Sequence, residues 1–293
     1  MEICGRDIEI RGGPIRIARL AADGFEFVND PKSVLEALGN CGERIDLFSF
    51  TQELPDATPK HDYPMEWDNI AALPVSTFDD WWDHQINAKT RNMVRRSQKL
   101  GVVAREVSFD DALLRGISAI YNESPIRQGK PFRHYQQDLE SLRAEHSTFL
   151  ERSVFIGAFL DDELIGFIKL VPANRQAGLM QIVSMIRHRD KAATNALIAE
   201  AVCSCANRSI QYLVYAKFDH GKNQRDTLGE FKKHNGFQRI EMPRYYVPLT
   251  AVGRAAIRLG LHRSFTDRIP ESILGKLRDI RNSWYQRRFQ TTT

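Results

Sequence analysis

The sequence lacks any long hydrophobic run, which excludes a chain that crosses a membrane as a helix. No segment approaches the roughly 18 consecutive apolar residues that such a helix requires. The N-terminus is charged from Glu2 onward, so we expect no signal peptide. These two absences favour a cytoplasmic protein.

Cysteine is also scarce. The four cysteines, Cys4, Cys41, Cys203 and Cys205, are scattered and do not form the framework of a disulfide-stabilised protein, so we interpret them as reduced thiols. Cys203 and Cys205 have no second pair of Cys or His at ligand spacing nearby. We therefore predict no metal site.

The composition is that of a folded chain. Hydrophobic residues make up 42% of the sequence and charged residues 27%, which excludes a disordered protein. A length of 293 residues is enough for one large domain, or one and a half ordinary ones, with a substantial core.

Positive charge is concentrated near the C-terminus. The formal net charge of the chain is +4, but residues 254–288 contain nine Lys or Arg and three Asp or Glu, a net charge of +6. The apolar residues Ile257, Leu261 and Phe265 lie four apart in this segment, as on one face of a helix. A basic helical tail over residues 251–293 can pack on the rest of the chain as a solvated face, or it can bind nucleic acid or an anionic membrane surface. The sequence leaves these alternatives open.

The N-terminal part predicts a small subdomain over residues 1–74. We expect short strands at residues 2–10, 14–20 and 25–28, a helix at 31–38 and a half-buried strand at 45–50. Residues 51–74 are rich in Pro, Asp and Glu and show little periodicity, so we place a domain boundary there.

A strongly basic helix follows, over about residues 87–100, and Gly101 ends it. It carries five cations and no acidic residue: Lys89, Arg91, Arg95, Arg96 and Lys99. Either acidic neighbours compensate this charge, or the helix binds a phosphate or carboxylate of a ligand.

Residues 75–250 predict one α/β domain. After a strand at 102–107, we expect helices at 109–121 and 136–146, a hairpin of strands at 154–159 and 164–171, a strand at 178–186 and a helix at 192–206. Residues 212–237 then read as a buried strand, a polar loop and a helix that ends at Gly236. The last strand is expected at 237–247. Polar loops between a strand and the helix that follows it are where open α/β sheets bind ligands.

Three segments in this order resemble the acyl-CoA N-acyltransferase (GNAT) superfamily, and within it the Fem-like branch of peptidoglycan aminoacyltransferases and related cell-envelope acyltransferases. They are KTRNMVRRSQKLGVVAREV, GAFLDDELIGFIKLV and FDHGKNQRDTLGEFKKHNGFQRIEMPRYYVPL. The resemblance covers about residues 73–249. It implies a mixed, mostly antiparallel sheet flanked by helices. The N-terminal segment is then either a small separate subdomain or a degenerate half of the same fold.

The resemblance also implies a donor site where the fourth strand meets the next helix, since this helix N-terminus binds the pyrophosphate of acetyl-CoA or a longer acyl-CoA. The residues placed there are Ile186, Arg187, His188, Arg189, Lys191, Ala192 and Thr194. Arg187 and Ala192 match the ends of the glycine-rich family motif, but Asp190 stands where the family has glycine. Acyl-CoA and a charged tRNA both stay open as donors.

For catalysis, the resemblance places Lys232 where many members of the superfamily have a tyrosine, in agreement with the Fem-like Phe-Lys pattern. We expect Asp219 or His220 to accept the proton of the attacking amine and Lys232 to stabilise negative charge on the carbonyl oxygen. Tyr215 and Ser184 are weaker candidates, because packing explains both. The predicted function is transfer of an acyl or aminoacyl group to an amine on a small molecule or envelope precursor. A nucleic-acid-associated protein and an inactive scaffold are the alternatives.

Overall fold

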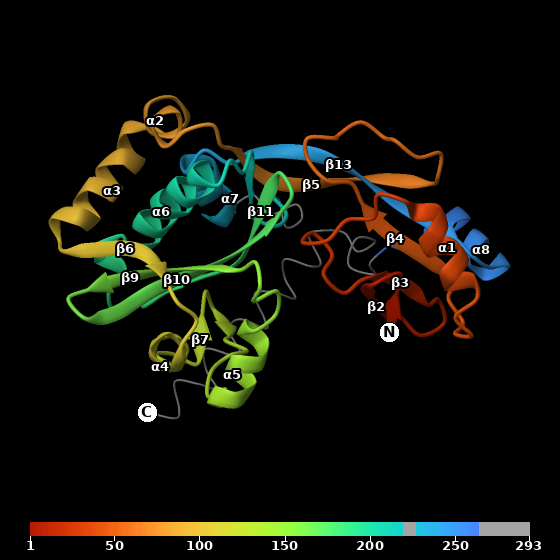
Figure 1. Cartoon of the computed structure of the whole chain (residues 1–293), viewed down its shortest axis with the longest axis horizontal. Coiled ribbons are helices and arrows are strands. Elements are labelled where there is room, and N and C mark those ends of the chain that lie inside the picture. The colour runs from red at the N-terminus through yellow and green to blue at the C-terminus, as the bar shows by residue number, and fades with distance from the viewer. Residues whose placement is uncertain (219–226, 264–293) are drawn as a thin grey trace. The chain divides into compact units, whose positions relative to one another are not determined.

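The computed structural model describes residues 1–218 and 227–263, and these form two compact units (Figure 1). The first unit combines residues 1–72 with 214–218 and 238–263. The second combines residues 73–213 with 227–237. The first unit is therefore built from both ends of the described chain.

The first unit contains a sheet with the strand order β1-β2-β3-β4-β13-β5. The β3–β4 pair is parallel, whereas β4 and β5 both run antiparallel to the long strand β13. The strands are β1 (Glu2–Ile3), β2 (Arg6–Arg11), β3 (Ile17–Leu20), β4 (Leu47–Thr51), β5 (Met65–Pro74) and β13 (Gln238–Pro248), and the helices are α1 (Pro31–Gly39) and α8 (Ala251–Arg258).

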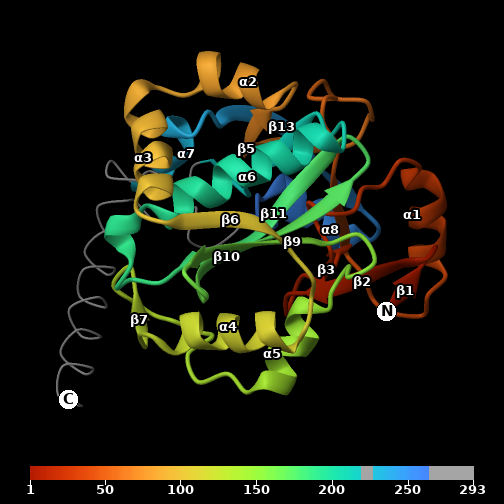
Figure 2. The ribbon, with the colours of Figure 1, turned by 60° about the vertical axis from the view of Figure 1, so that its left-hand side comes forward.

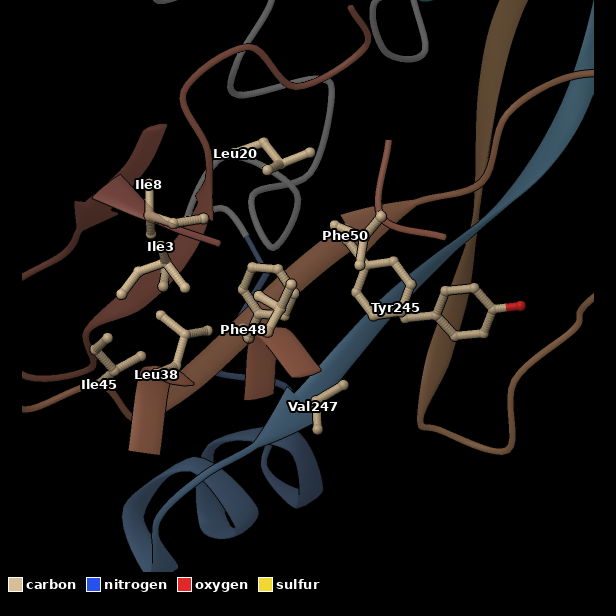
Figure 3. Packing of buried hydrophobic residues seen from close by; sticks show 12 residues of the cluster. Ile3, Ile8, Leu20, Leu38, Ile45, Phe48, Phe50, Tyr245 and Val247 are labelled. Atoms are coloured by element: carbon tan, nitrogen blue, oxygen red, sulfur yellow. The ribbon is translucent and has the colours of Figure 1, made fainter. Parts of the chain in front are cut away.

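The core of this unit lies between its strands and helix α1, as Figure 3 shows. Phe48 and Phe50 of β4 are fully buried and stack on each other, and Phe50 also stacks on Tyr245 of β13. Leu38 supplies the apolar face of α1. Aromatic side chains of this size bury a large apolar area, so they contribute most to the stability of this unit.

Helix α8 packs closely against the start of β4. The Thr250 hydroxyl caps α8 by accepting from the Gly253 N–H, and it donates to the buried carboxylate of Asp46 at 2.7 Å. A Cβ atom on Gly253 would lie 1.9 Å from the Asp46 carbonyl oxygen. Only glycine permits this approach of the two backbones.

The second unit contains a sheet with the order β12-β11-β10-β9-β6, in which β6, β9, β10 and β11 pair antiparallel (Figure 2). Helices α3 and α6 lie on one face, and α4 and α5 lie on the other (Figures 1 and 2). The strands are β6 (Val102–Val107), β9 (Val154–Leu160), β10 (Glu163–Ala173), β11 (Gln176–Ser184) and β12 (Tyr212–Val214). The helices are α2 (Phe78–Asp80), α3 (Ala88–Lys99), α4 (Asp111–Asn122), α5 (Leu139–His146), α6 (Ala193–Asn207) and α7 (Thr227–His234), and a hairpin of β7 (Ile126–Arg127) and β8 (Lys130–Pro131) follows α4.

Local sequence signals explain where these helices begin. The side chains of Asn87, Asp110 and Asp138 accept hydrogen bonds from backbone N–H groups in the first turns of α3, α4 and α5. Gly236 follows α7 with φ of +90°, the left-handed conformation that ends a helix.

The predicted fold class, a mixed and mostly antiparallel sheet flanked by helices, is confirmed. Three local predictions were wrong. The strand predicted to be half-buried at residues 45–50 is buried at all six positions. Residues 65–74 form a strand of ten residues where the sequence predicted an irregular boundary, because β13 pairs with a segment that has no alternating pattern of its own. Residues 25–28 form no strand; the chain makes only an isolated bridge between Asp23 and Glu26.

A substitution at Gly253 tests the close approach of α8 to β4. Alanine in a helix is normally more stable than glycine by about 1 kcal/mol. We expect Gly253→Ala to lower the free energy of unfolding by about 2 kcal/mol or more, because the methyl group meets a backbone oxygen. Urea denaturation measures this. Val252→Ala in the same helix, at a side chain that is 43% exposed, is the control and should change stability by less than about 0.5 kcal/mol. A variant Gly253→Ala as stable as the parent would contradict the packing described.

Candidate active site

The site begins at an irregularity in β11. Strands β10 and β11 are in register except at one point, where Leu170 opposes Leu179 and Lys169 opposes Gln181. Met180 is therefore an extra residue, a β-bulge. A bulge bends its strand and changes the direction of the side chains that follow it.

A buried polar cluster holds the strand at this bulge. The Gln181 amide donates to the Tyr121 hydroxyl at 2.5 Å, and this hydroxyl also hydrogen-bonds His146 Nε2 at 3.3 Å. The Lys169 ammonium donates to the His146 and Thr148 carbonyl oxygens at 2.8 and 2.6 Å, at the C-terminal end of α5. Burial lowers the pKa of His146 to about 4 and that of Lys169 to about 8.

Beside the bulged strand, β12 is short. The N–H groups of Gln211 and Tyr212 both donate to the Arg175 carbonyl oxygen, so β12 starts level with the start of β11. Strand β12 ends at Val214 after three residues, whereas β11 continues for nine residues to Ser184. The two strands therefore share only the beginning of β11.

The turn from β11 to α6 leads into an uncapped helix. Residues Arg189–Lys191 form one turn of 3-10 helix, and Ala192 follows in the left-handed conformation with φ of +55°. Ala192 is the N-cap of α6, and its methyl group cannot accept a hydrogen bond from the first turn. The hydroxyl groups of Ser184 and Thr194 lie 3.0 Å apart and connect the end of β11 to this first turn. The start of α6 can therefore receive an anion or a carbonyl oxygen from outside the helix.

Most of the charges on this turn already have protein partners. The side chains of Arg187 and His188 both pair with Glu163 at the start of β10, and Lys191 pairs with Asp190 at 3.2 Å. Arg189 is exposed. The predicted donor-binding residues thus lie together on one turn, with Ile186 exposed at its beginning.

Glu123 and Arg127, which sequence reasoning missed, bind the backbone at the end of β11. The Glu123 carboxylate accepts from the N–H groups of Ile186 at 2.5 Å and Arg187 at 2.8 Å. Arg127 donates to the Ser184 carbonyl oxygen at 2.8 Å and to Glu123 at 3.3 Å. The two residues are four apart in the sequence, the spacing of an ion pair, and Arg127 lies in the loop SPIRQGKPFRHY. The four-residue spacing favours an ion pair between Glu123 and Arg127. No local sequence pattern predicts that this pair binds the backbone at the end of β11.

The four predicted catalytic residues are divided among the first unit, the second unit and the residues outside the described part of the chain. Asp219 and His220 lie outside the described residues. Tyr215 belongs to the first unit, and burial raises its pKa to about 12. Lys232 lies in α7 of the second unit and is fully buried. The roles assigned to these four residues stay predictions.

The five cations of helix α3 fall into two groups: Arg91 binds backbone carbonyl groups of the chain, and the other four are exposed. Arg91 donates to the carbonyl oxygens of Trp82 and Ile86, both at 2.8 Å, and so closes the turn that precedes α3. The other four cations are exposed, and among the described residues none of them has an acidic partner within ion-pair distance: Lys89, Arg95, Arg96 and Lys99. Helix α3 packs beside α6, and Arg96 is close enough to help lower the pKa of Asp190.

No protein family matches the sequence, and no match was found among curated proteins. Solved structures do resemble the chain. A crystal structure of FemX aligns with a TM-score of 0.61 and 12% identity, over 81% of this chain and 83% of that one. The C-terminal domain of a putative lysylphosphatidylglycerol synthetase from Agrobacterium fabrum aligns with a TM-score of 0.55 and 13% identity, over 86% and 83%. The L-PGS structure from Bacillus licheniformis gives 0.53 and 15%, over 85% and 83%.

At such low identity these alignments show the fold alone. The chain has the GNAT-like fold of these proteins, which confirms the resemblance found in the sequence. Within the described residues no helix is long and apolar enough to cross a membrane. The same part of the chain contains no group of three or more Cys, His, Asp or Glu placed to hold a metal ion.

The buried histidine at the bulge makes stability depend on pH. His146 has a pKa of about 4 in the folded chain against about 6.5 when unfolded, so unfolding takes up a proton between these values. We expect its contribution to stability to be fully present above pH 6.5 and to decline as the pH falls to 4, by up to about 1.4 kcal/mol per pH unit. His146→Gln should flatten this decline in urea denaturation at pH 7, 6, 5 and 4.

The control for this experiment is His84→Gln, because the His84 side chain is 76% exposed. This substitution should leave the decline unchanged. An equal pH dependence in the parent and in His146→Gln would show that His146 is not held neutral by its burial.

Proposed function

We propose that the chain is an acyltransferase that moves an acyl or aminoacyl group from an activated donor, such as an acyl-CoA, to an amine. The amine nitrogen attacks the carbonyl carbon directly, the C–N bond forms, and the bond from this carbon to the sulfur or oxygen of the donor breaks. The proton of the amine leaves through a base, and the thiol or hydroxyl group departs. Holding the two reactants together supplies much of the rate enhancement in such a reaction.

The observation that carries this proposal is the uncapped N-terminus of α6 directly after the bulged strand. The turn that leads to this helix carries the exposed cation Arg189, so the helix dipole and this cation favour the same kind of ligand. The short β12 leaves β11 without that neighbour beyond its beginning, where backbone groups can bind the amide-containing arm of a donor. The GNAT-like fold is consistent with this use of the strand and the helix.

In this proposal, Asp219 or His220 accepts the proton and Lys232 stabilises the negative charge of the tetrahedral intermediate. Tyr215 is a weaker candidate for the proton acceptor, since a pKa of about 12 keeps its hydroxyl protonated and unable to act as a base near neutral pH. The acceptor is an amine on a small molecule or an envelope precursor.

Donor binding can be measured directly. A ligand at about one hundred times its Kd stabilises the folded state by about 2.7 kcal/mol, which raises the Tm by several degrees. We expect acetyl-CoA or a longer acyl-CoA to produce this shift, and the double variant Arg189→Glu, Lys191→Glu to lose it. The control is the double variant Lys32→Glu, Arg254→Glu, which changes the net charge by the same amount at exposed positions of the first unit. This control should show the same rise in Tm with acyl-CoA as the parent. The absence of both a shift and acyl transfer to any amine would remove acyl-CoA as the donor.

A second candidate function is nucleic-acid binding through α3, because its four exposed cations have no acidic partner in the described chain. The logarithm of the binding constant falls linearly with the logarithm of the salt concentration. Each phosphate that a cation neutralises steepens this slope by about 0.9 for double-stranded DNA and about 0.7 for single strands. We expect Arg96→Glu with Lys99→Glu to reduce the slope for tRNA by about two if α3 binds phosphates. The Lys32 and Arg254 double variant should leave the slope unchanged. A parent chain that binds neither acyl-CoA nor nucleic acid would instead be a scaffold.

A further inference from the structure

The backbone N–H groups at the end of β11 already bind an anion, which is the chain's own Glu123. Both oxygens of this carboxylate are used: Oε2 accepts from Ile186 and Oε1 accepts from Arg187. The Arg127 guanidinium adds a third donor at 3.3 Å. Three donors from two separate segments therefore converge on one carboxylate, immediately before the turn that leads to α6.

The Arg127 donor is fixed by contacts that do not involve Glu123. Arg127 is held by the carbonyl oxygens of Ile120 at 2.5 Å and Ser184 at 2.8 Å, and its guanidinium lies 4.9 Å from the centre of the Phe132 ring. Its Nε atom is buried and has no hydrogen-bond partner in the described part of the chain. The site is consequently a preformed anion site, and Glu123 is the group that occupies it.

The position of this anion matters for a donor that carries phosphates. Such a donor would bring its diphosphate to the turn at residues 187–191 and the start of α6, next to the Glu123 carboxylate. The side chains of Glu123 and Arg127 are only 11% and 14% exposed, so water screens the repulsion between two anions poorly at this point. A phosphate must either displace Glu123 from the N–H groups or bind close beside a negative charge.

We propose that Glu123 is a specificity-determining residue that competes with donor phosphate for the N–H groups of Ile186 and Arg187. Its carboxylate disfavours donors that place a diphosphate here, such as CoA thioesters, relative to donors that need no anion at this point. This inference rests on the proposed donor site, and it narrows the chemical class of donor. A purely structural role, in which Glu123 only ties the end of α4 to β11, is the competing explanation.

Glu123→Gln separates the two explanations. Glutamine removes the charge and keeps one oxygen, which can accept from one of the two N–H groups, while its NH2 group cannot accept from the other. We expect this variant to bind CoA at least about tenfold more tightly than the parent, since one charge repulsion of about 1.4 kcal/mol corresponds to a factor of ten. Pantetheine, which has no phosphate, should bind the parent and the variant within about twofold of each other. Isothermal titration at one fixed ionic strength measures both ligands.

The matched control is Glu163→Gln, which removes a carboxylate that pairs with Arg187 and His188 on the same turn. The Glu163 side chain is 42% exposed and better screened by water, so its removal should change CoA binding by less than about threefold. An equal gain in both variants would mean that only the total charge of the turn matters, and this would overturn the assignment to Glu123.

Two further results would overturn the proposal. One is equal CoA affinity in the parent and Glu123→Gln, including no binding by either. The other is a lower Tm of Glu123→Gln without any gain in CoA binding, which is the result that a structural tie predicts. Acyl transfer by the parent is assayed separately, so transfer without a Glu123 effect leaves the enzyme proposal intact. A gain in CoA binding by Glu123→Gln without acyl transfer from any donor would support the competition between Glu123 and phosphate and contradict the proposed enzyme activity.

Discussion

The bulge at Met180 sets the position of the groups at the end of β11. By adding one residue to β11, it changes the register of this strand from Gln181 onward, so that Gln181 reaches the Tyr121 hydroxyl and the strand ends at Ser184. The backbone N–H groups beyond Ser184 then meet Glu123, and the turn to α6 follows. Without the extra residue, the side chains after it would exchange faces of the sheet, because successive residues of a strand point to opposite sides.

The polar cluster behind the bulge explains how this irregular strand is held in one conformation. Tyr121, His146 and Lys169 are all buried, and the Tyr121 hydroxyl, His146 Nε2 and the Lys169 ammonium have hydrogen-bond partners within the second unit. Burying such groups is unfavourable unless they are paired, and a fully paired network disfavours alternative arrangements. The Lys169 ammonium also lies at the C-terminal end of α5, where carbonyl groups of the last turn lack partners. The same contacts thus fix both α5 and the strand that carries the site.

Much of the second unit follows from local sequence. Helices α3, α4 and α5, the hairpin of β9 and β10 and the glycine after α7 depend on signals that act over a few residues, and the sequence predicted them close to where they occur. The capping side chains Asn87, Asp110 and Asp138 were not predicted as caps. The turn to α6 was also predicted as one cluster of residues. Strand β5 was not predicted, because its hydrogen bonds come from β13, which lies about 170 residues later in the chain. Glu123 was missed for the same reason: its partners are the N–H groups of residues 186 and 187, and no local pattern encodes that contact.

Stability alone does not explain why the Glu123–Arg127 pair is charged. Both side chains lose most of their contact with water, and a pair of this kind often contributes little net stability, because desolvation offsets the attraction. Burial has lowered the pKa of Arg127 despite the neighbouring carboxylate, which shows that desolvation outweighs the attraction here. A connection between α4 and β11 needs no charge, since a neutral side-chain oxygen can also accept a hydrogen bond from a backbone N–H. What charge adds is selectivity among ligands, and the place where it is added is the backbone leading to the start of α6.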